Sequence, residues 1–290
     1  MIYLLLSILC STSIFIIFKA FEKYKVDNFL AIVINYLIAT LTGFLAVETV
    51  PSISEISESS WFINSLILGF FFITLFNIMA VTAQKLGPSV ASVANKMALI
   101  IPVIFAVFYY NDSLTAFKLI GILFALIGIY LTTIKPKAIK SKVNWKLLFI
   151  PAVLFLGSGF IDTFIKYNQE THLNDNTDAS KLFSSLIFLT ALVLGLLVLL
   201  FKKKSSSFNW ATLIGGLILG IVNYGSIYFI IQAFNVSNLE TSVVFPLNNM
   251  GVVILTCLLS FVLFKEKFSR LNKLGIAFSI LAILLISFSK

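Results

Sequence analysis

Ten long apolar segments, each close to the length that crosses a bilayer, constrain the fold of this chain more than any other feature. A hydrocarbon core of about 30 Å is crossed by roughly 20 apolar residues in a helix. The segments do not alternate apolar with polar residues, so they predict membrane-spanning helices and not the strands of a barrel. They run over residues 2–20, 29–47, 61–83, 88–109, 114–134, 147–168, 180–201, 210–234, 241–264 and 271–288.

The overall composition supports a protein embedded in lipid. Of the 290 residues, 59% are hydrophobic and only 11% are charged, whereas about 25% are charged in a soluble domain. The first segment begins at Met1 with no cationic leader and no small-residue cleavage site, so we expect a retained helix and not a signal peptide. The sequence therefore predicts an all-α, multi-pass protein of a bacterial inner membrane.

The residues that most often carry catalysis or bind metals are scarce. The two cysteines, Cys10 and Cys257, lie inside predicted spans, and the single histidine, His172, lies in a polar loop. These residues cannot build a disulfide framework, a zinc site or a histidine-based catalytic centre. A glycine-rich, lysine-ending ATP loop is also absent from the sequence. We therefore expect no enzyme activity, no metal and no cofactor.

The net charge of +9 reflects membrane topology and not nucleic-acid binding. With ten spans the loops alternate sides, and 16 basic residues fall on one set of loops against 4 on the other. The positive-inside rule places the richer set in the cytoplasm, so both termini should lie outside. The richer set includes the linker 135–146 and the stretch 202–209, which should also attract anionic lipid headgroups.

A weak internal repeat divides the chain into two halves of five spans each. Ser89 aligns with Ser242 and Met97 with Met250; after a one-residue shift, Gly121 aligns with Gly275. The predicted organisation is a first repeat over 1–134, the basic linker 135–146 and a second repeat over 147–290. Because each half has an odd number of helices, the second half enters the membrane from the opposite side. Inverted repeats of this kind produce alternating access in transporters.

Two stretches give the repeat a more specific likeness. Gln84-Lys-Leu-Gly-Pro-Ser-Val-Ala is followed by a span and by Asp112-Ser-Leu-Thr-Ala-Phe-Lys-Leu-Ile-Gly121, and Glu266-Lys-Phe-Ser-Arg-Leu-Asn-Lys-Leu-Gly275 repeats the motif. This pattern resembles the drug/metabolite transporter superfamily, EamA type, in which Asp112 would commonly be a glutamate. The resemblance implies ten helices in two inverted five-helix bundles around a central cavity. It also implies secondary-active transport of a small metabolite, such as an amino acid, with export favoured.

The acidic residues of this motif have a structural interpretation. Asp112 and Glu266 lie at span boundaries beside a helix start, where a carboxylate is favourable to the helix dipole. The glycine about two turns later allows close helix contact. We expect these residues to fix the fold and not to contact substrate.

Lys96 is the candidate for binding substrate. A lysine at the centre of a bilayer costs about 2.5–3.5 kcal/mol on insertion scales, so it must face a cavity or a partner. Lys96 lies eight residues into its span and corresponds in the repeat to Asn249. We expect it to meet an anionic group of the substrate, with Asn95, Asn248 and Asn249 as neighbours. The alternative is a structural lysine that pairs with a carboxylate or with the carbonyls of a helix end.

Further polar residues within the spans are candidates with competing structural roles. Asp162 is a candidate for proton coupling, because desolvation would raise its pKa, but it could instead pair with Lys96 or Lys166. Pro102 and Pro246 are candidate hinges that should free the carbonyls of Ala98 and Ser242. Four more side chains would line a cavity or join helices by hydrogen bonds, namely Asn35, Asn77, Asn223 and Tyr224.

Two other functional classes compete with a carrier. A non-transporting scaffold or subunit would show no saturable ligand binding, and an intramembrane lipid-modifying enzyme would need clustered His, Asp or Arg residues that the sequence lacks. The expected partners are a small-molecule substrate and membrane lipid, with no nucleic acid. A homodimer remains open.

Overall fold

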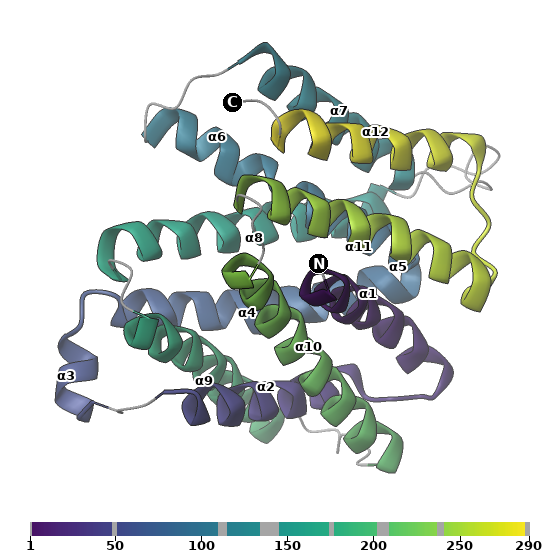
Figure 1. The fold of residues 1–290 in the computed structure, drawn as a ribbon. Coiled ribbons are helices and arrows are strands. Elements are labelled where there is room, and N and C mark those ends of the chain that lie inside the picture. The colour runs from purple at the N-terminus through teal and green to yellow at the C-terminus, as the bar shows by residue number, and fades with distance from the viewer. Residues whose placement is uncertain are drawn as a thin grey trace. The chain divides into compact units, whose positions relative to one another are not determined.

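The computed structural model describes residues 2–47, 51–109, 115–133, 145–173, 177–201, 209–236 and 241–287. Within these ranges every element of secondary structure is helical (Figure 1). The elements are α1 (Ile2–Lys23), α2 (Asn28–Leu45), α3 (Ile53–Glu58), α4 (Phe62–Lys85), α5 (Pro88–Met97), α6 (Ile100–Tyr109), α7 (Ala116–Thr133), α8 (Trp145–Asn168), the π-helical turn η1 (Gln169–Leu173), α9 (Thr177–Phe201), α10 (Trp210–Val236), α11 (Thr241–Phe264) and α12 (Arg270–Ser287).

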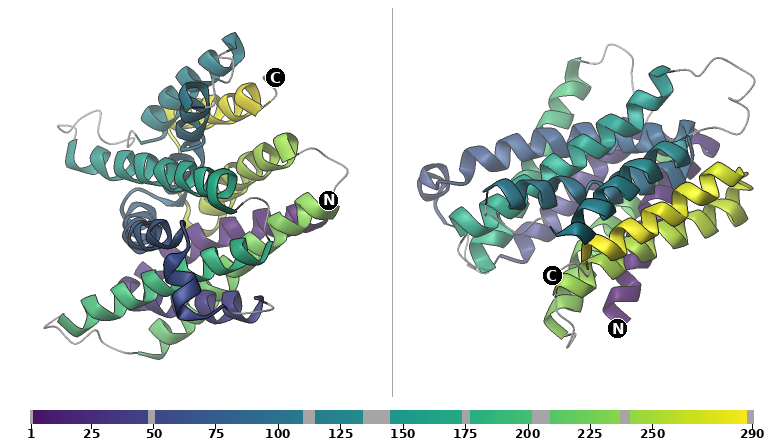
Figure 2. Two further views of the ribbon diagram at one scale, coloured as in Figure 1. Left: turned by 90° about the vertical axis from the view of Figure 1, so that its left-hand side faces the viewer. Right: turned by 90° about the horizontal axis from the view of Figure 1, so that it is seen from above.

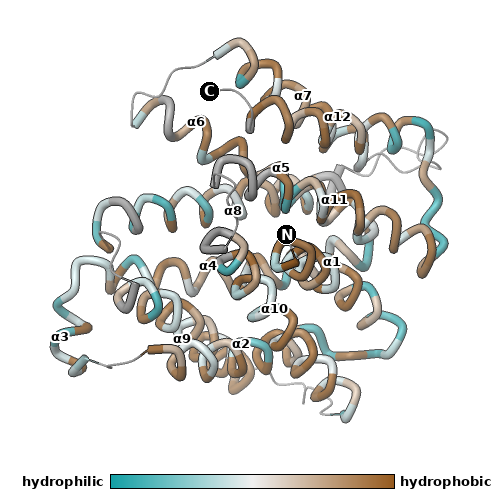
Figure 3. The backbone as a smooth tube through the Cα atoms, viewed as in Figure 1, coloured by the Kyte–Doolittle hydropathy of each residue, from teal (hydrophilic) through white to brown (hydrophobic). Residues whose placement is uncertain are grey.

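Eight helical segments of the described chain are long and apolar enough to cross a membrane. They begin with α1 and α2 and include α4, α9 and α10 over most of their lengths. Figure 3 shows that hydrophobic residues dominate the bodies of these helices. The prediction of an all-helical, multi-pass membrane protein is therefore confirmed, and each of the ten predicted segments coincides with one or two of the helices.

The predicted span 88–109 is interrupted, and one expectation about it is wrong. The segment forms two helices, α5 and α6, separated by Ala98 and Leu99. Pro102 has no N–H and cannot bond to the Ala98 carbonyl, as expected. That carbonyl is not free, however, because it accepts a hydrogen bond of 2.9 Å from the N–H of Ile101. The N–H of Ile101, three residues after Ala98, thus takes the place of the N–H that Pro102 lacks.

A short helix, α3, was missed in the sequence although its signal is present there. Ser52 accepts a hydrogen bond from the N–H of Glu55, and the Glu55 carboxylate accepts one of 2.8 Å from the N–H of Ser52. This reciprocal capping box follows the pattern Ser-x-x-Glu. The capping hydrogen bonds lower the pKa of Glu55.

Contacts between residues divide the chain into two compact units. Unit 1 contains residues 1–20, 78–159 and 225–290, and unit 2 contains residues 21–77 and 160–224. The boundaries pass through α1, α4, α8 and α10, so each of these helices contributes to both units. The units are therefore not the two halves of the sequence, and the division into repeats at 135–146 remains a prediction.

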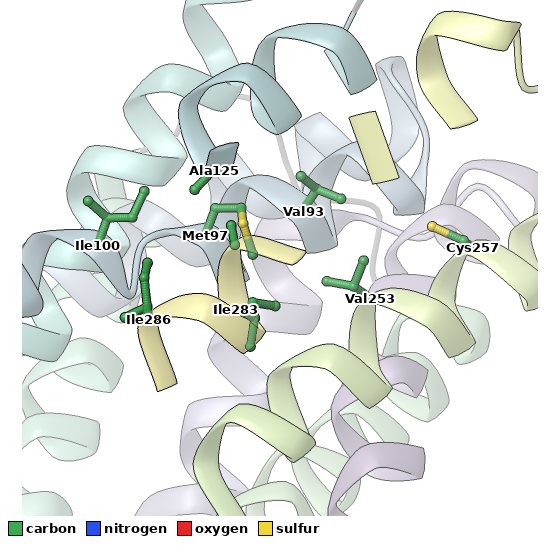
Figure 4. Close-up of a cluster of buried hydrophobic side chains, with 9 residues drawn as sticks. Val93, Met97, Ile100, Ala125, Val253, Cys257, Ile283 and Ile286 are labelled. Carbon is green, nitrogen blue, oxygen red and sulfur yellow. The ribbon is translucent and has the colours of Figure 1, made fainter. Parts of the chain in front are cut away.

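The core of unit 1 is formed by apolar side chains from α5, α6, α7, α11 and α12 (Figure 4). Val93 and Met97 of α5 pack against Val253 of α11 and Ile283 of α12, and all four are at most 1% exposed. The core thereby places α5, which carries Lys96, against α11, which carries Asn248 and Asn249.

Helices α7 and α12 of unit 1 lie side by side and cross at close range (Figures 1 and 2). A Cβ atom placed on Gly275, near the start of α12, would lie 2.7 Å from the backbone nitrogen of Thr132, near the end of α7. A Cβ atom on Gly121, near the start of α7, would lie 2.6 Å from Ile286, near the end of α12. Since the start of each helix meets the end of the other, the two are antiparallel.

Unit 2 contains a second close antiparallel pair, α2 and α9. Gly43, near the end of α2, faces Ser185 near the start of α9. Gly195, near the end of α9, faces Val33 near the start of α2. Between them, Tyr36 of α2 is fully buried and stacks on Phe188 of α9 at 6.2 Å between ring centroids.

Candidate functional site

Unit 2 contains a pair of buried asparagines that connects two helices. The side-chain amide of Asn223, on α10, donates a hydrogen bond of 3.1 Å to the Oδ1 atom of Asn35, on α2. Asn35 is 0% exposed and Asn223 is 6% exposed. Two glycines of α10 allow α10 and α2 to approach closely. Gly216 lies against Ile34 of α2, and Gly220 lies against Ile38. Two of the predicted site residues are thus brought together.

Helix α2 also carries buried polar atoms that have no hydrogen-bond partner in the described part of the chain. Among the residues that the structure describes, the Nδ2 atom of Asn35, the hydroxyl of Tyr36 and the hydroxyl of Thr40 are buried without a hydrogen-bond partner. Buried polar groups in proteins are almost always paired with protein or water. Water or a polar ligand would satisfy these atoms. Tyr36 and Thr40 were not predicted as site residues.

Replacing Asn223 by leucine should destabilise the protein, because Asn35 would keep both its buried polar groups and lose its partner. An unsatisfied buried group costs about 1–3 kcal/mol. The matched control is Asn77→Leu, since the amide of Asn77 donates to the Ile73 carbonyl of its own helix. Apparent melting temperature in detergent would measure the difference. Equal effects of the two substitutions would contradict a role for the Asn35–Asn223 bond.

Unit 1 contains the other predicted polar cluster, on α5, α8 and α11. The side-chain amide of Asn95 donates a hydrogen bond of 2.9 Å to the hydroxyl of Ser158 on α8. Ser158 was not predicted as a site residue. On α11, Asn248 and Asn249 are 5% and 3% exposed, and the Oδ1 atom of Asn248 is buried without a partner within the described part of the chain.

Lys96 lies in the last turn of α5 and is half-buried. The break after Met97 creates a helix end inside the predicted span, and a cation near a helix C-terminus is favourable to the helix dipole. This position is compatible with both interpretations of Lys96 from the sequence. The lysine can interact with the carbonyls of the helix end, or it can face a ligand. The role of Lys96 in substrate binding remains a prediction.

The remaining candidates lie on α4, α6, α8, α10 and α11. Asp162 is exposed on α8, Tyr224 is half-buried on α10, and Asn77 bonds to its own helix. Pro102 is half-buried on α6, and Pro246 lies within α11, where its side-chain environment falls outside the described residues. The proton-coupling and hinge roles of these residues are not tested by the geometry.

A polar network in unit 1 surrounds Glu266, in the loop between α11 and α12. The hydroxyl of Ser89 donates a hydrogen bond of 3.0 Å to the Oε2 atom of Glu266. Ser89 is the second residue of α5, whose first residue is Pro88 and whose N-cap is Gly87, with φ of 110°. The Glu266 carboxylate thus lies at the N-terminus of α5, where a negative charge is favourable to the helix dipole.

Two long side chains extend this network to α1 and α4. The Lys19 ammonium donates a hydrogen bond of 2.6 Å to the Gln84 carbonyl, and the Gln84 amide donates one of 3.0 Å to the Phe18 carbonyl. Burial raises the pKa of Glu266, while the Ser89 hydrogen bonds and the positive charge of Lys19 oppose the increase. The structural interpretation of Glu266 fits this geometry, although the stabilised helix is α5 and not the adjacent α12. Asp112 lies outside the described residues.

Three comparisons relate the chain to known proteins. The profile of the EamA-like transporter family matches residues 1–134. An uncharacterized protein of Haemophilus influenzae is 30% identical over 287 residues, which cover 97% of this chain and 95% of the relative. A protein of known crystal structure has a TM-score of 0.62 at 13% identity, over 98% of this chain and 99% of that one. This last likeness concerns the fold alone.

Proposed function

Because the chain belongs to the EamA-like transporter family, we propose that it carries a small metabolite across the membrane by alternating access. The fold we propose is two inverted repeats of five helices around a central cavity, in a bacterial inner membrane. The observation that carries this proposal is the reciprocal packing of equivalent helices from the two halves.

The reciprocity is clearest for α7 and α12, the last spans of the two predicted repeats. The offset that aligns Gly121 with Gly275 also aligns Gly128 with Ala282 and Thr132 with Ile286. Gly121 faces Ala282 and Ile286, and Gly275 faces Gly128 and Thr132. The contact is therefore self-complementary, as expected when a local two-fold axis relates two antiparallel helices.

The pair α2 and α9, the second spans of the two repeats, repeats the pattern within unit 2. One offset aligns Gly43 with Gly195 and also Val33 with Ser185. Gly43 faces Ser185, and Gly195 faces Val33. Equivalent helices that pack antiparallel support halves of opposite membrane orientation, which is the arrangement that alternating access uses.

The buried polar atoms support a solute pathway over a purely structural array. Polar groups inside apolar spans are costly unless they meet partners, water or substrate. Lys96 favours an anionic or zwitterionic substrate, and the neighbouring amides of Asn95, Asn248 and Asn249 would bind its polar groups. We propose an amino acid or a related metabolite as the substrate class, export as the direction and Asp162 as the candidate coupling group.

A thermal-shift screen of the purified protein with amino acids, nucleotides, sugar phosphates and cationic drugs tests this proposal. A ligand at 100 times its dissociation constant stabilises the folded state by about 2.7 kcal/mol. Lys96→Ala should abolish the shift caused by an anionic or zwitterionic ligand. Lys23→Ala is the matched control, since it removes the same charge from an exposed residue at the end of α1 and should leave the shift unchanged.

The outcomes separate a carrier from a scaffold. A ligand-dependent shift that Lys96→Ala removes and Lys23→Ala retains would support the carrier and locate its site. A shift that both variants retain would reject Lys96 as a binding residue. No shift with any ligand, in a protein that melts cooperatively, would favour a non-transporting scaffold.

A further inference from the structure

The surface of α11 and α12 in unit 1 contains an apolar groove with cations at one end. Its volume is about 670 Å³, and it is distinct from the asparagine clusters described above. The groove floor and walls come from both helices and from the loop between them. Its lining comprises Ile254, Cys257, Leu258, Phe261, Lys267, Phe268, Lys273, Ile276 and Ile280.

The apolar lining follows one stripe along each helix. On α11 the stripe includes Ile254, Leu258 and Phe261, which are spaced by four and three residues and extend over about 10 Å of helix. On α12 it includes Ile276 and Ile280. Leu258 and Phe261 are 57% and 60% exposed from the protein, so both face whatever surrounds this side of the unit.

The charged end of the groove lies where α11 ends and α12 begins. Lys267 lies in the loop that follows α11, and Lys273 lies in the first turn of α12; both are exposed. Figure 3 shows hydrophilic residues gathered at this loop, beside the hydrophobic bodies of α11 and α12. The nearby carboxylate of Glu266 is directed to Ser89 on α5. Two cations therefore lie where apolar spans emerge from the membrane.

We propose that this groove binds an anionic phospholipid, with an acyl chain along the apolar stripes and its phosphate at Lys267 and Lys273. The apolar lining suits hydrocarbon, and the two lysines suit a headgroup at the membrane interface. Basic pockets between membrane helices bind anionic lipid headgroups for this reason. The proposal requires only that α11 and α12 contact lipid, so it does not depend on the transported substrate.

Quenching of an introduced tryptophan by brominated lipids tests the site in the full-length protein. Phe261→Trp places an indole at an exposed aromatic position of the groove, and Leu196→Trp places one at an exposed position of α9. Each is reconstituted in vesicles that mix phosphatidylglycerol with phosphatidylcholine, with either lipid brominated, and the parent's emission is subtracted. We expect brominated phosphatidylglycerol to be enriched about tenfold at Phe261→Trp and not at Leu196→Trp.

Two pairs of charge variants separate the groove from the general attraction of a basic surface. Lys267→Gln with Lys273→Gln should reduce the enrichment to the level of the α9 position. Lys265→Gln with Arg270→Gln removes the same charge from exposed neighbours that do not line the groove, and should leave most of the enrichment.

Three results would overturn the proposal. One is equal enrichment at the groove and at α9, and another is an equal loss in both pairs of charge variants. The third is an absence of quenching by either lipid at Phe261→Trp, which would mean that protein, such as a second copy of this chain, covers the groove.

Discussion

Gly275→Ala should unfold at a clearly lower temperature than the parent protein, by roughly 5 °C. The added methyl group would lie 2.7 Å from the backbone nitrogen of Thr132 and 2.9 Å from the carbonyl oxygen of Gly128. Backbone atoms of a helix cannot rotate away, so α7 and α12 would have to separate. Overpacking of this kind typically costs about 1–3 kcal/mol, and each kcal/mol shifts the melting temperature by about 2–4 °C in a domain of 150–250 residues.

Gly225→Ala is the matched control, because it places the same methyl group inside another helix of unit 1. Its nearest neighbour would be the Cys10 sulfur, a side-chain atom at 3.2 Å. Alanine is favoured over glycine in a helix by about 1 kcal/mol, and both variants gain this contribution. Apparent melting temperature in one detergent provides the comparison. A Gly275→Ala protein as stable as Gly225→Ala would show that the α7–α12 crossing is looser than described.

Glu266→Ala is the second substitution expected to have a large effect. It removes the acceptor of the hydroxyl of Ser89, a residue that is 2% exposed at the N-terminus of α5. Unsatisfied buried donors cost about 1–3 kcal/mol. Glu266→Gln keeps an acceptor oxygen and should be less destabilising than Glu266→Ala. Equal stability of Glu266→Ala and the parent would contradict the network.

The raised pKa of Glu266 predicts that the stability of the folded protein depends on pH. Burial raises the pKa of Glu266 in the folded protein above its ordinary value of 4.5. The folded state therefore binds the carboxyl proton of Glu266 more tightly than the unfolded state does. The resulting stabilisation is present in full at a pH below the ordinary pKa of the group. It is lost as the pH rises through the raised pKa.

Comparison of the parent with Glu266→Gln isolates this contribution from those of other groups. Melting temperatures measured from pH 4 to pH 8, a range set about the ordinary pKa of a glutamate, should show the parent losing stability relative to Glu266→Gln as the pH rises. A difference between the two proteins that stays constant over this range would mean that the pKa of Glu266 is not raised by folding.

The kind of fold could be predicted from the sequence because each membrane helix is recognised from its own apolar segment, without reference to the rest of the chain. Lipid offers no hydrogen bonds to a backbone, so a long apolar run must form a helix wherever it crosses the membrane. The segment boundaries therefore agree with the helices to within a few residues, as α11 (Thr241–Phe264) shows. The interruption at Ala98 and Leu99 was less predictable, because Pro102 can kink a helix or break it.

The candidate site was only partly predictable for a different reason. Asn35 and Asn223 were identified because an amide is conspicuous in an apolar segment, but their hydrogen bond joins helices far apart in the chain. Tyr36 and Thr40 were missed because tyrosine and threonine are common in membrane helices and gain significance only when buried without partners. The apolar groove likewise could not be predicted, because it exists only where α11 and α12 come together.

The amino-acid sequence by itself determined that this is a multi-pass helical membrane protein, and its glycine and acid spacing indicated the transporter family. Tertiary structure decided which helices meet and what each conspicuous residue does there. Glu266 lies beside its own helix α12 in the sequence, yet its carboxylate accepts a hydrogen bond from Ser89 at the start of α5. Hydrophobicity acts on each segment alone, whereas a hydrogen bond or a close crossing depends on the positions of two segments at once.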